Sequence, residues 1–153
     1  MVRQRVVRLV PTAAVGLAPS EATLVNIETV MWVDAPPERT LPPMSILGQP
    51  VVVRLRLDHV EWDFGDGKSA TSEGAGKAYD EQHDPCRSVS CPDYFGHTYR
   101  RTGPVTVAAT AYWQASFTVG GGGAVDIPGT VAGPTGTAEL AVKQARSVLV
   151  PNP

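Results

Sequence analysis

The sequence predicts an all-β fold, an antiparallel β-sandwich with one core. The chain has 153 residues, enough for one ordinary domain. Its 15 glycines and 14 prolines lie among many Val, Thr and Ala, which is typical of short strands joined by turns. The other two observations are an alternating apolar segment at residues 105–119 and the stretch EWDFGDGKS at residues 61–69, which signals a hairpin.

The N-terminal third reads as strands separated by prolines. We expect a strand at Val6–Val10 and a second at Thr23–Val33, which ends at the prolines that follow Asp34. The proline-rich segment Glu38–Pro50 predicts an irregular crossing. Residues 51–57 alternate between apolar odd positions and even positions that include two arginines, so they predict a half-buried strand.

The segment Val105–Val119 carries the clearest strand pattern, because all its odd positions are apolar. At ~3.3 Å per residue it would be about 50 Å long, so we expect a bend or a small break near its middle. Gly120–Gly123 then let the chain return as a ribbon through residues 124–131. Residues 137–150 fit either a helix or a strand, and we favour the closing strand of a sandwich.

The stretch at residues 61–69 predicts a tight hairpin. Trp62 and Phe64 alternate toward the core, whereas Glu61 and Asp63 face solvent. The two glycines that follow, Gly65 and Gly67, supply positive φ in the turn, as Asp-Gly hairpins require.

These residues also carry a resemblance to a known family. Trp62-Asp63-Phe64-Gly65-Asp66-Gly67, followed by Gly96-His97-Thr98-Tyr99, resembles the polycystic kidney disease (PKD) domain, an immunoglobulin-like β-sandwich. The resemblance covers roughly Gln49–Val119, and the flanks, with Leu24–Val33, are similar to secreted actinobacterial PKD-domain proteins of unknown function. It implies extracellular or envelope placement and a role in adhesion or assembly without catalysis. It also implies structural roles for Tyr99, which would bury its ring and bond the backbone, and for His97.

The resemblance gives the expected organisation of the chain. Residues 1–48 would form an N-terminal arm and first strands packed on a PKD-like sandwich of residues 49–153, in one structural domain overall. The family pattern has no counterpart to the insert at residues 73–92. The first twenty residues resemble a leader only weakly, because Pro11 and Gly16 interrupt the apolar part, and we expect the true leader to have been removed.

The insert holds the two cysteines of the chain, Cys86 and Cys91. An even pair in an exported chain predicts a disulfide that closes a short loop. The alternative is a zinc site, since His83 and His97 would add two nitrogens to the two sulfurs. The ligand order matches no strong zinc motif, and we expect the disulfide.

Four carboxylates lie near the hairpin: Asp58, Glu61, Asp63 and Asp66. Asp63 and Asp66 are the candidates for a calcium site, but the run lacks the ligand register of an EF-hand, so we expect exposed turn carboxylates and no cofactor. The sequence has no nucleophile elbow, no HExxH and no phosphate-binding loop. We therefore expect no enzymatic activity.

The remaining functions are those of a binding module. A net charge of −2 with dispersed basic residues gives no pull toward nucleic acid, and no apolar run approaches the ~20 residues of a membrane span. We expect protein–protein contact or self-assembly at the cell surface, with the arginine-bearing segment Arg3–Val10 and the C-terminal strand pairing at sheet edges. The alternative is a carbohydrate-binding accessory module, whose platform would use outward or insert aromatics: Tyr79, Tyr94, Phe95 and Tyr112.

Overall fold

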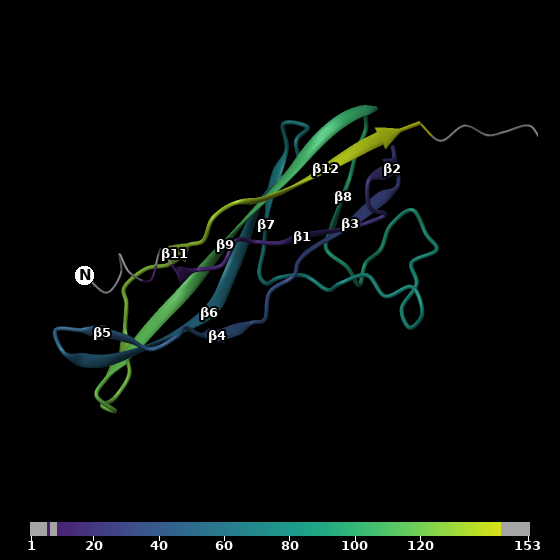
Figure 1. The fold of residues 1–153 in the computed structure, drawn as a ribbon. Helices are drawn as coiled ribbons and strands as arrows, with labels where there is room; N and C mark the ends of the chain where they lie inside the picture. The colour runs from purple at the N-terminus through teal and green to yellow at the C-terminus, as the bar shows by residue number, and fades with distance from the viewer. Residues whose placement is uncertain (1–5, 7–8, 145–153) are drawn as a thin grey trace, which may run out of the picture.

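Two β-sheets make up the protein. The computed structural model describes residue 6 and residues 9–144, and every regular element in them is a strand (Figure 1). The small sheet has the order β1 (Val15–Ala18), β3 (Glu28–Val33) and β8 (Gly96–Thr98). The large sheet has the order β2 (Ala22–Leu24), β12 (Gly136–Lys143), β9 (Gly103–Val119), β6 (Gln49–Asp63) and β4 (Glu38–Thr40). The predicted all-β class is confirmed.

Four short strands extend the large sheet beside its two long strands. On β6 these are β5 (Met44–Ile46) and β7 (Ser69–Ser72), and on β9 they are β10 (Val125–Asp126) and β11 (Val131–Ala132). Among the described strands, every pairing is antiparallel except that of β2 with β12, which is parallel. The prediction of a wholly antiparallel arrangement was therefore wrong at this edge.

The centre of the large sheet is the long antiparallel pair of β6 and β9. Val53, Leu55 and Trp113 are buried on one face, and Arg54 and Arg56 are exposed on the other, as the alternation predicts. The expected irregularity lies in β6 and not in β9: Leu57 pairs with Trp113 and His59 with Tyr112, so Asp58 is an extra residue that forms a β-bulge. The strand β9 continues unbroken through this point.

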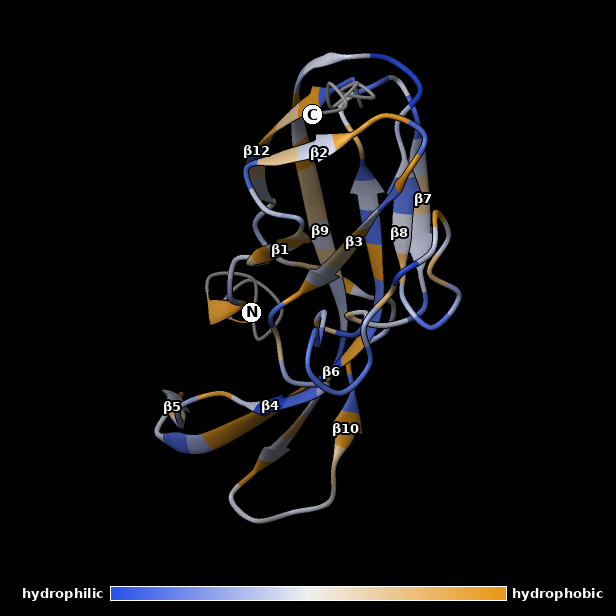
Figure 2. Ribbon diagram, turned by 90° about the vertical axis from the view of Figure 1, so that its right-hand side faces the viewer, coloured by the Kyte–Doolittle hydropathy of each residue, from blue (hydrophilic) through white to orange (hydrophobic). Residues whose placement is uncertain are grey.

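The small sheet covers only part of the β6–β9 pair. The other part, residues 49–57 of β6 and 113–119 of β9, runs on with β4, β5 and β10, and we call this the β-extension. It reaches away from β2, β3 and β8 in Figure 1, and in Figure 2 its strands β4, β5 and β10 lie together at the lower end.

Both parts share one hydrophobic core. Met31 and Val33 of β3 pack in the same buried cluster as Leu55, Trp62 and Trp113 of the large sheet. The core also includes residues from the N-terminal segment and from the loop before β5, namely Val6, Val10, Ala13 and Leu41. Because they share one core, Val6 and residues 9–48 pack on the rest of the described chain.

Three local predictions were wrong. The Val10 amide donates to the Val6 carbonyl at 3.1 Å, the bond of a helical turn and not of a strand ladder, because an apolar pair four residues apart covers the core. The segment Thr23–Val33 divides into β2 and β3 at Asn26 (φ 65°), where the chain changes sheets. The crossing Glu38–Pro50 contains the short strands β4 and β5.

The structure describes the predicted C-terminal strand through residue 144. The prediction of a strand rather than a helix is confirmed for residues 137–143, which lie in β12. Residues 145–150 of that prediction fall outside the described residues, as do Arg3 and Arg5 of the N-terminal pairing segment.

Candidate interaction surfaces

The predicted hairpin joins β6 to β7. Trp62 and Phe64 are 2% and 3% exposed, and the Trp62 indole Nε1 donates to Ser72 Oγ at 3.0 Å. Gly65 has φ 81° and Gly67 has φ 85°. A Cβ on Gly65 would lie 2.5 Å from the Thr106 carbonyl oxygen of β9, whereas nothing lies within 4 Å of one on Gly67. The first glycine is therefore required by packing as well as by φ.

The acids of the hairpin hold the turn. Asp63 Oδ1 accepts the Gly65 amide at 2.9 Å, and Asp66 Oδ1 accepts the Lys68 amide at 3.1 Å. The other carboxylate oxygen of Asp66 lies 2.7 Å from His97 Nε2. Partial burial acts to raise the pKa of Asp66, but the hydrogen bonds from His97 and Lys68 outweigh it, so this pKa lies below its ordinary value.

His97 and Tyr99 lie under the hairpin. The His97 ring stacks on Phe64 with ring centroids 3.9 Å apart and an interplanar angle of 3°, and it meets Tyr99 edge-on at 4.7 Å. The Tyr99 hydroxyl donates to the Phe64 carbonyl at 2.7 Å. Burial of this hydroxyl, together with the charges of Asp66 and Asp63, raises the pKa of Tyr99. This cluster joins β6 to β8 and the segment after it.

The two cysteines of the insert form the predicted disulfide. The insert is ordered around it: the Cys86 amide donates to the Tyr79 hydroxyl at 3.0 Å, and the Tyr94 hydroxyl donates to the Asp84 carbonyl at 2.6 Å. The Glu28 amide of β3 donates to the Val89 carbonyl inside the closed loop at 2.9 Å. The disulfide loop is therefore attached to the small sheet.

The disulfide overturns the zinc alternative, because a disulfide offers no thiolate to a metal. The two histidines of that set also lie with other partners. His83 Nδ1 is 2.9 Å from Asp80 Oδ2, and His97 bonds Asp66. Within residues 6 and 9–144, no group of three or more His, Cys, Asp and Glu side chains lies close enough together to hold a metal ion.

The four aromatic side chains named for a carbohydrate platform do not form one surface, because Tyr79 and Tyr94 pack together while Phe95 and Tyr112 have other partners. Phe95 packs against Trp62 with centroids 5.2 Å apart, and Tyr94 is buried against Tyr79 at 5.3 Å. Tyr112 lies on the large sheet and stacks on His59 at 4.6 Å. Every aromatic side chain in the described residues is buried or half-buried.

A polar network runs across the outer face of the large sheet. The Arg56 guanidinium donates to Gln114 Oε1 at 2.6 Å, and Gln114 Nε2 donates to Asp58 Oδ1 at 2.7 Å. The second oxygen of Asp58 lies 2.6 Å from His59 Nδ1. The hydrogen bonds with His59 and Gln114 lower the pKa of the Asp58 carboxyl. The side chains of Tyr112 and His59 stack beside this chain of contacts.

The bulge explains why Asp58 and His59 join one network. An extra residue in a strand turns two successive side chains to the same face. The sequence contains a signal for it, since the apolar positions of this strand are odd through Leu57 and even from Val60. From the sequence, Asp58 is expected to be an exposed turn carboxylate and His59 has no assigned role, whereas the structure places both residues in the network on the sheet face.

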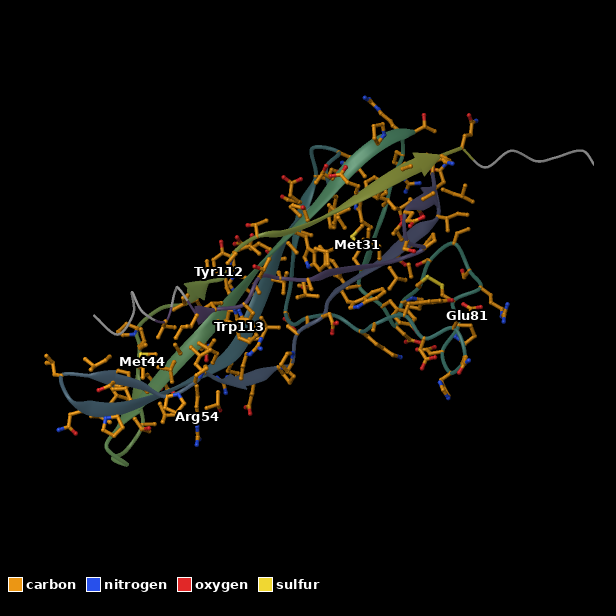
Figure 3. All side chains as sticks on the ribbon, viewed as in Figure 1. Met31, Met44, Arg54, Glu81, Tyr112 and Trp113 are labelled. Carbon is orange, nitrogen blue, oxygen red and sulfur yellow. A yellow bond between two sulfur atoms is a disulfide. The ribbon has the colours of Figure 1, made fainter. Side chains whose placement is uncertain are left out.

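A groove continues the network onto the β-extension. Its volume is about 1070 Å³, and it lies between β4 on one side and residues 126–130 on the other. Its charged lining comprises three arginines and two acids: Arg39, Arg54, Arg56, Glu38 and Asp126. Figure 3 shows Arg54 on the side of the β-extension opposite Met44. The groove can form ionic and hydrogen-bonded contacts with an elongated partner.

Comparison of the chain with protein-family models, with curated proteins and with solved structures gave no match. Among the described residues, no helix has the length and apolar character needed to cross a bilayer.

Proposed function

We propose that this protein is a non-catalytic interaction module that makes protein–protein contacts outside the cell or in its envelope. The observation that carries the proposal is the β-extension, which presents the polar groove on one face and short strands along both sides. Arginine and tyrosine are enriched in protein interfaces, and here Arg54, Arg56 and Tyr112 line one continuous outer face.

The disulfide supports a location outside the cell or in its envelope. Structural disulfides persist in oxidising compartments, and Cys86–Cys91 closes a surface loop in a chain with no other cysteine. An oxidising location fits a module that meets its partner outside the cytosol.

The hairpin cluster supports a PKD-like, immunoglobulin-related architecture. In immunoglobulin folds a corner tyrosine hydrogen-bonds the backbone, and Tyr99 makes such a bond to Phe64, although across strands and not to its own neighbourhood in sequence. The two sheets of this protein are strongly curled and unequal in size, so the relation we infer concerns the hairpin region and its core.

Carbohydrate binding is the second candidate, and one observation favours it. Tyr112 is half-exposed on the same outer face as Gln114 and Arg56, which line the groove, so a sugar that extends from the groove along this face would meet one aromatic ring and several hydrogen-bonding groups. A sugar platform normally needs an accessible ring face, and His59 stacks on one face of Tyr112. We therefore rank this function below protein binding.

Capture from the native cell envelope tests the proposal. The immobilised chain should retain a discrete protein. The double variant Arg54→Glu with Arg56→Glu should abolish this capture, because it changes the net charge of the groove lining from positive to negative. A matched control is Arg87→Glu with Arg101→Glu, since both residues are exposed and lie outside the groove. Retention of polysaccharide without protein, or equal capture by both double variants, would contradict the proposal. Thermal melts of all variants show whether the fold is intact.

A further inference from the structure

The end of the β-extension is apolar and carries no charge. We call residues 41–53 and 115–125 the extension tip, and neither segment contains Asp, Glu, Lys or Arg. Leu47 is 89% exposed, the highest value among the exposed large apolar residues that the structure describes, and Val119 and Val125 are 41% and 52% exposed. Half-buried apolar side chains adjoin them: Met44, Ile46 and Phe117. An exposed apolar end of this kind marks an interaction site.

The backbone holds Leu47 in the outermost position. Ile46 pairs with Gln49, which leaves Leu47 and Gly48 as a two-residue hairpin loop. Their φ angles are 51° and 78°, as in a type I′ turn. Such turns favour Asn-Gly, and a leucine at positive φ is strained. The Leu47 side chain is 89% exposed, so packing within the described part of the chain does not account for a leucine at this position.

We propose that the extension tip is an anchor that inserts Leu47 into an uncharged, apolar cleft of a protein partner. The inference deepens the function proposed above and depends on it. A convex tip with one dominant apolar side chain fits a concave site, where a single buried anchor supplies much of the binding energy. Because the tip has no charged side chain, complementarity requires a neutral cleft, and the contribution of the tip to binding should be insensitive to salt.

The composition and size of the tip argue against two other binding partners, a lipid membrane and a second copy of the chain. A membrane-inserted tip normally carries Trp or Tyr at the level of the headgroups, and the tip has neither. Its two turns would also carry backbone polar groups into hydrocarbon, where nothing can bond them. A tip-to-tip contact between two copies would bury only a few side chains, well short of the ~800 Å² per partner of a stable interface.

Leu47→Asn separates anchoring from stability. Asparagine suits a type I′ turn, so the melting temperature should rise by about 2–4 °C, while the apolar anchor is lost. The matched control is Val89→Asn, because Val89 is 64% exposed in the disulfide loop, away from the tip. Leu47→Asn should reduce envelope capture at least tenfold relative to the unaltered chain, and Val89→Asn should leave it unchanged. Both ratios should be the same in low salt and in ~1 M sodium chloride, even where salt weakens the contacts of the groove and so lowers capture by every variant.

A diazirine amino acid at position 47 identifies what the tip contacts. The expected result is one cross-linked protein whose labelled peptide, located by mass spectrometry, lies on an apolar surface of that protein. Overturning results are adducts of lipid, flotation with equimolar phosphatidylcholine and phosphatidylglycerol vesicles, or adducts with a second copy. If the unaltered chain and Leu47→Asn capture the partner equally well, the anchor proposal is wrong while the proposed function stands. Absence of any capture by the unaltered chain refutes the proposed function as well.

Discussion

The Tyr99 hydroxyl should account for a measurable share of the stability. Tyr99→Phe removes one oxygen from a side chain that is 1% exposed and leaves the buried Phe64 carbonyl without the donor at 2.7 Å. A typical hydrogen bond contributes about 1 kcal/mol, and leaving a buried acceptor unsatisfied costs about 1–3 kcal/mol. The expected loss is therefore about 2 kcal/mol, or about 4–8 °C in melting temperature for a chain of this size.

Urea unfolding, followed by tryptophan fluorescence, measures this loss. The midpoint should fall with an unchanged slope, because the substitution alters stability and not the surface exposed on unfolding. Tyr112→Phe is the matched control: its hydroxyl bonds the exposed Glu61 on the outer face, where water can replace it, so the loss should stay below about 0.5 kcal/mol. Equal, small losses for both variants would refute the view that the hydroxyl of Tyr99 joins the hairpin to the core.

Two further predictions concern the same hairpin. Gly67→Ala should lower the free energy of unfolding by about 1 kcal/mol, the penalty for positive φ alone. Gly65→Ala should lower it by about 2 kcal/mol or more, because its Cβ would also meet the backbone of Thr106. Equal losses for the two variants in urea unfolding would contradict the close approach of Gly65 to Thr106. The pKa of Asp66 lies below its ordinary value of 3.8 in the folded protein, so the carboxylate stabilises the fold above that pH, and the contribution is lost as the pH falls through the folded-state pKa. Asp66→Asn should therefore be less stable than the unaltered chain at neutral pH and match it in strong acid, and a stability difference independent of pH would refute the role of the charge.

Patterns confined to one strand could be predicted from the sequence. Alternation in residues 51–55 and 107–115 places the correct side chains inside, because a strand with one face in the core repeats every second residue, whereas Val119 at the end of the predicted strand is exposed. The hairpin at Gly65-Asp66-Gly67 and the disulfide followed from local chemistry in the same way. These features need no knowledge of what lies across the core.

Features set by contacts between distant segments could not be predicted. The split at Asn26 occurs because β2 joins the large sheet and β3 the small one, which a continuous run of β-forming residues does not reveal. Val6 and Val10 are apolar for the sake of the core they cover, and five residues cannot show whether they do so as a turn or as a strand. The bulge at Asp58 was visible in the change of apolar parity, but the polar network depends on Gln114, which comes from another strand.

The parallel pairing of β2 with β12 limits how early during folding the large sheet can gain its edge strand β2. Ala22–Leu24 bond to residues 141–143, so nearly the whole described chain separates the two partners. Contacts this distant in sequence form slowly, because a long loop must close before any gain is realised. During synthesis from the N-terminus, β2 cannot pair with its neighbour in the large sheet until β12, the last described strand, has emerged. A fragment cut near residue 48 would therefore separate groups that need each other to become ordered.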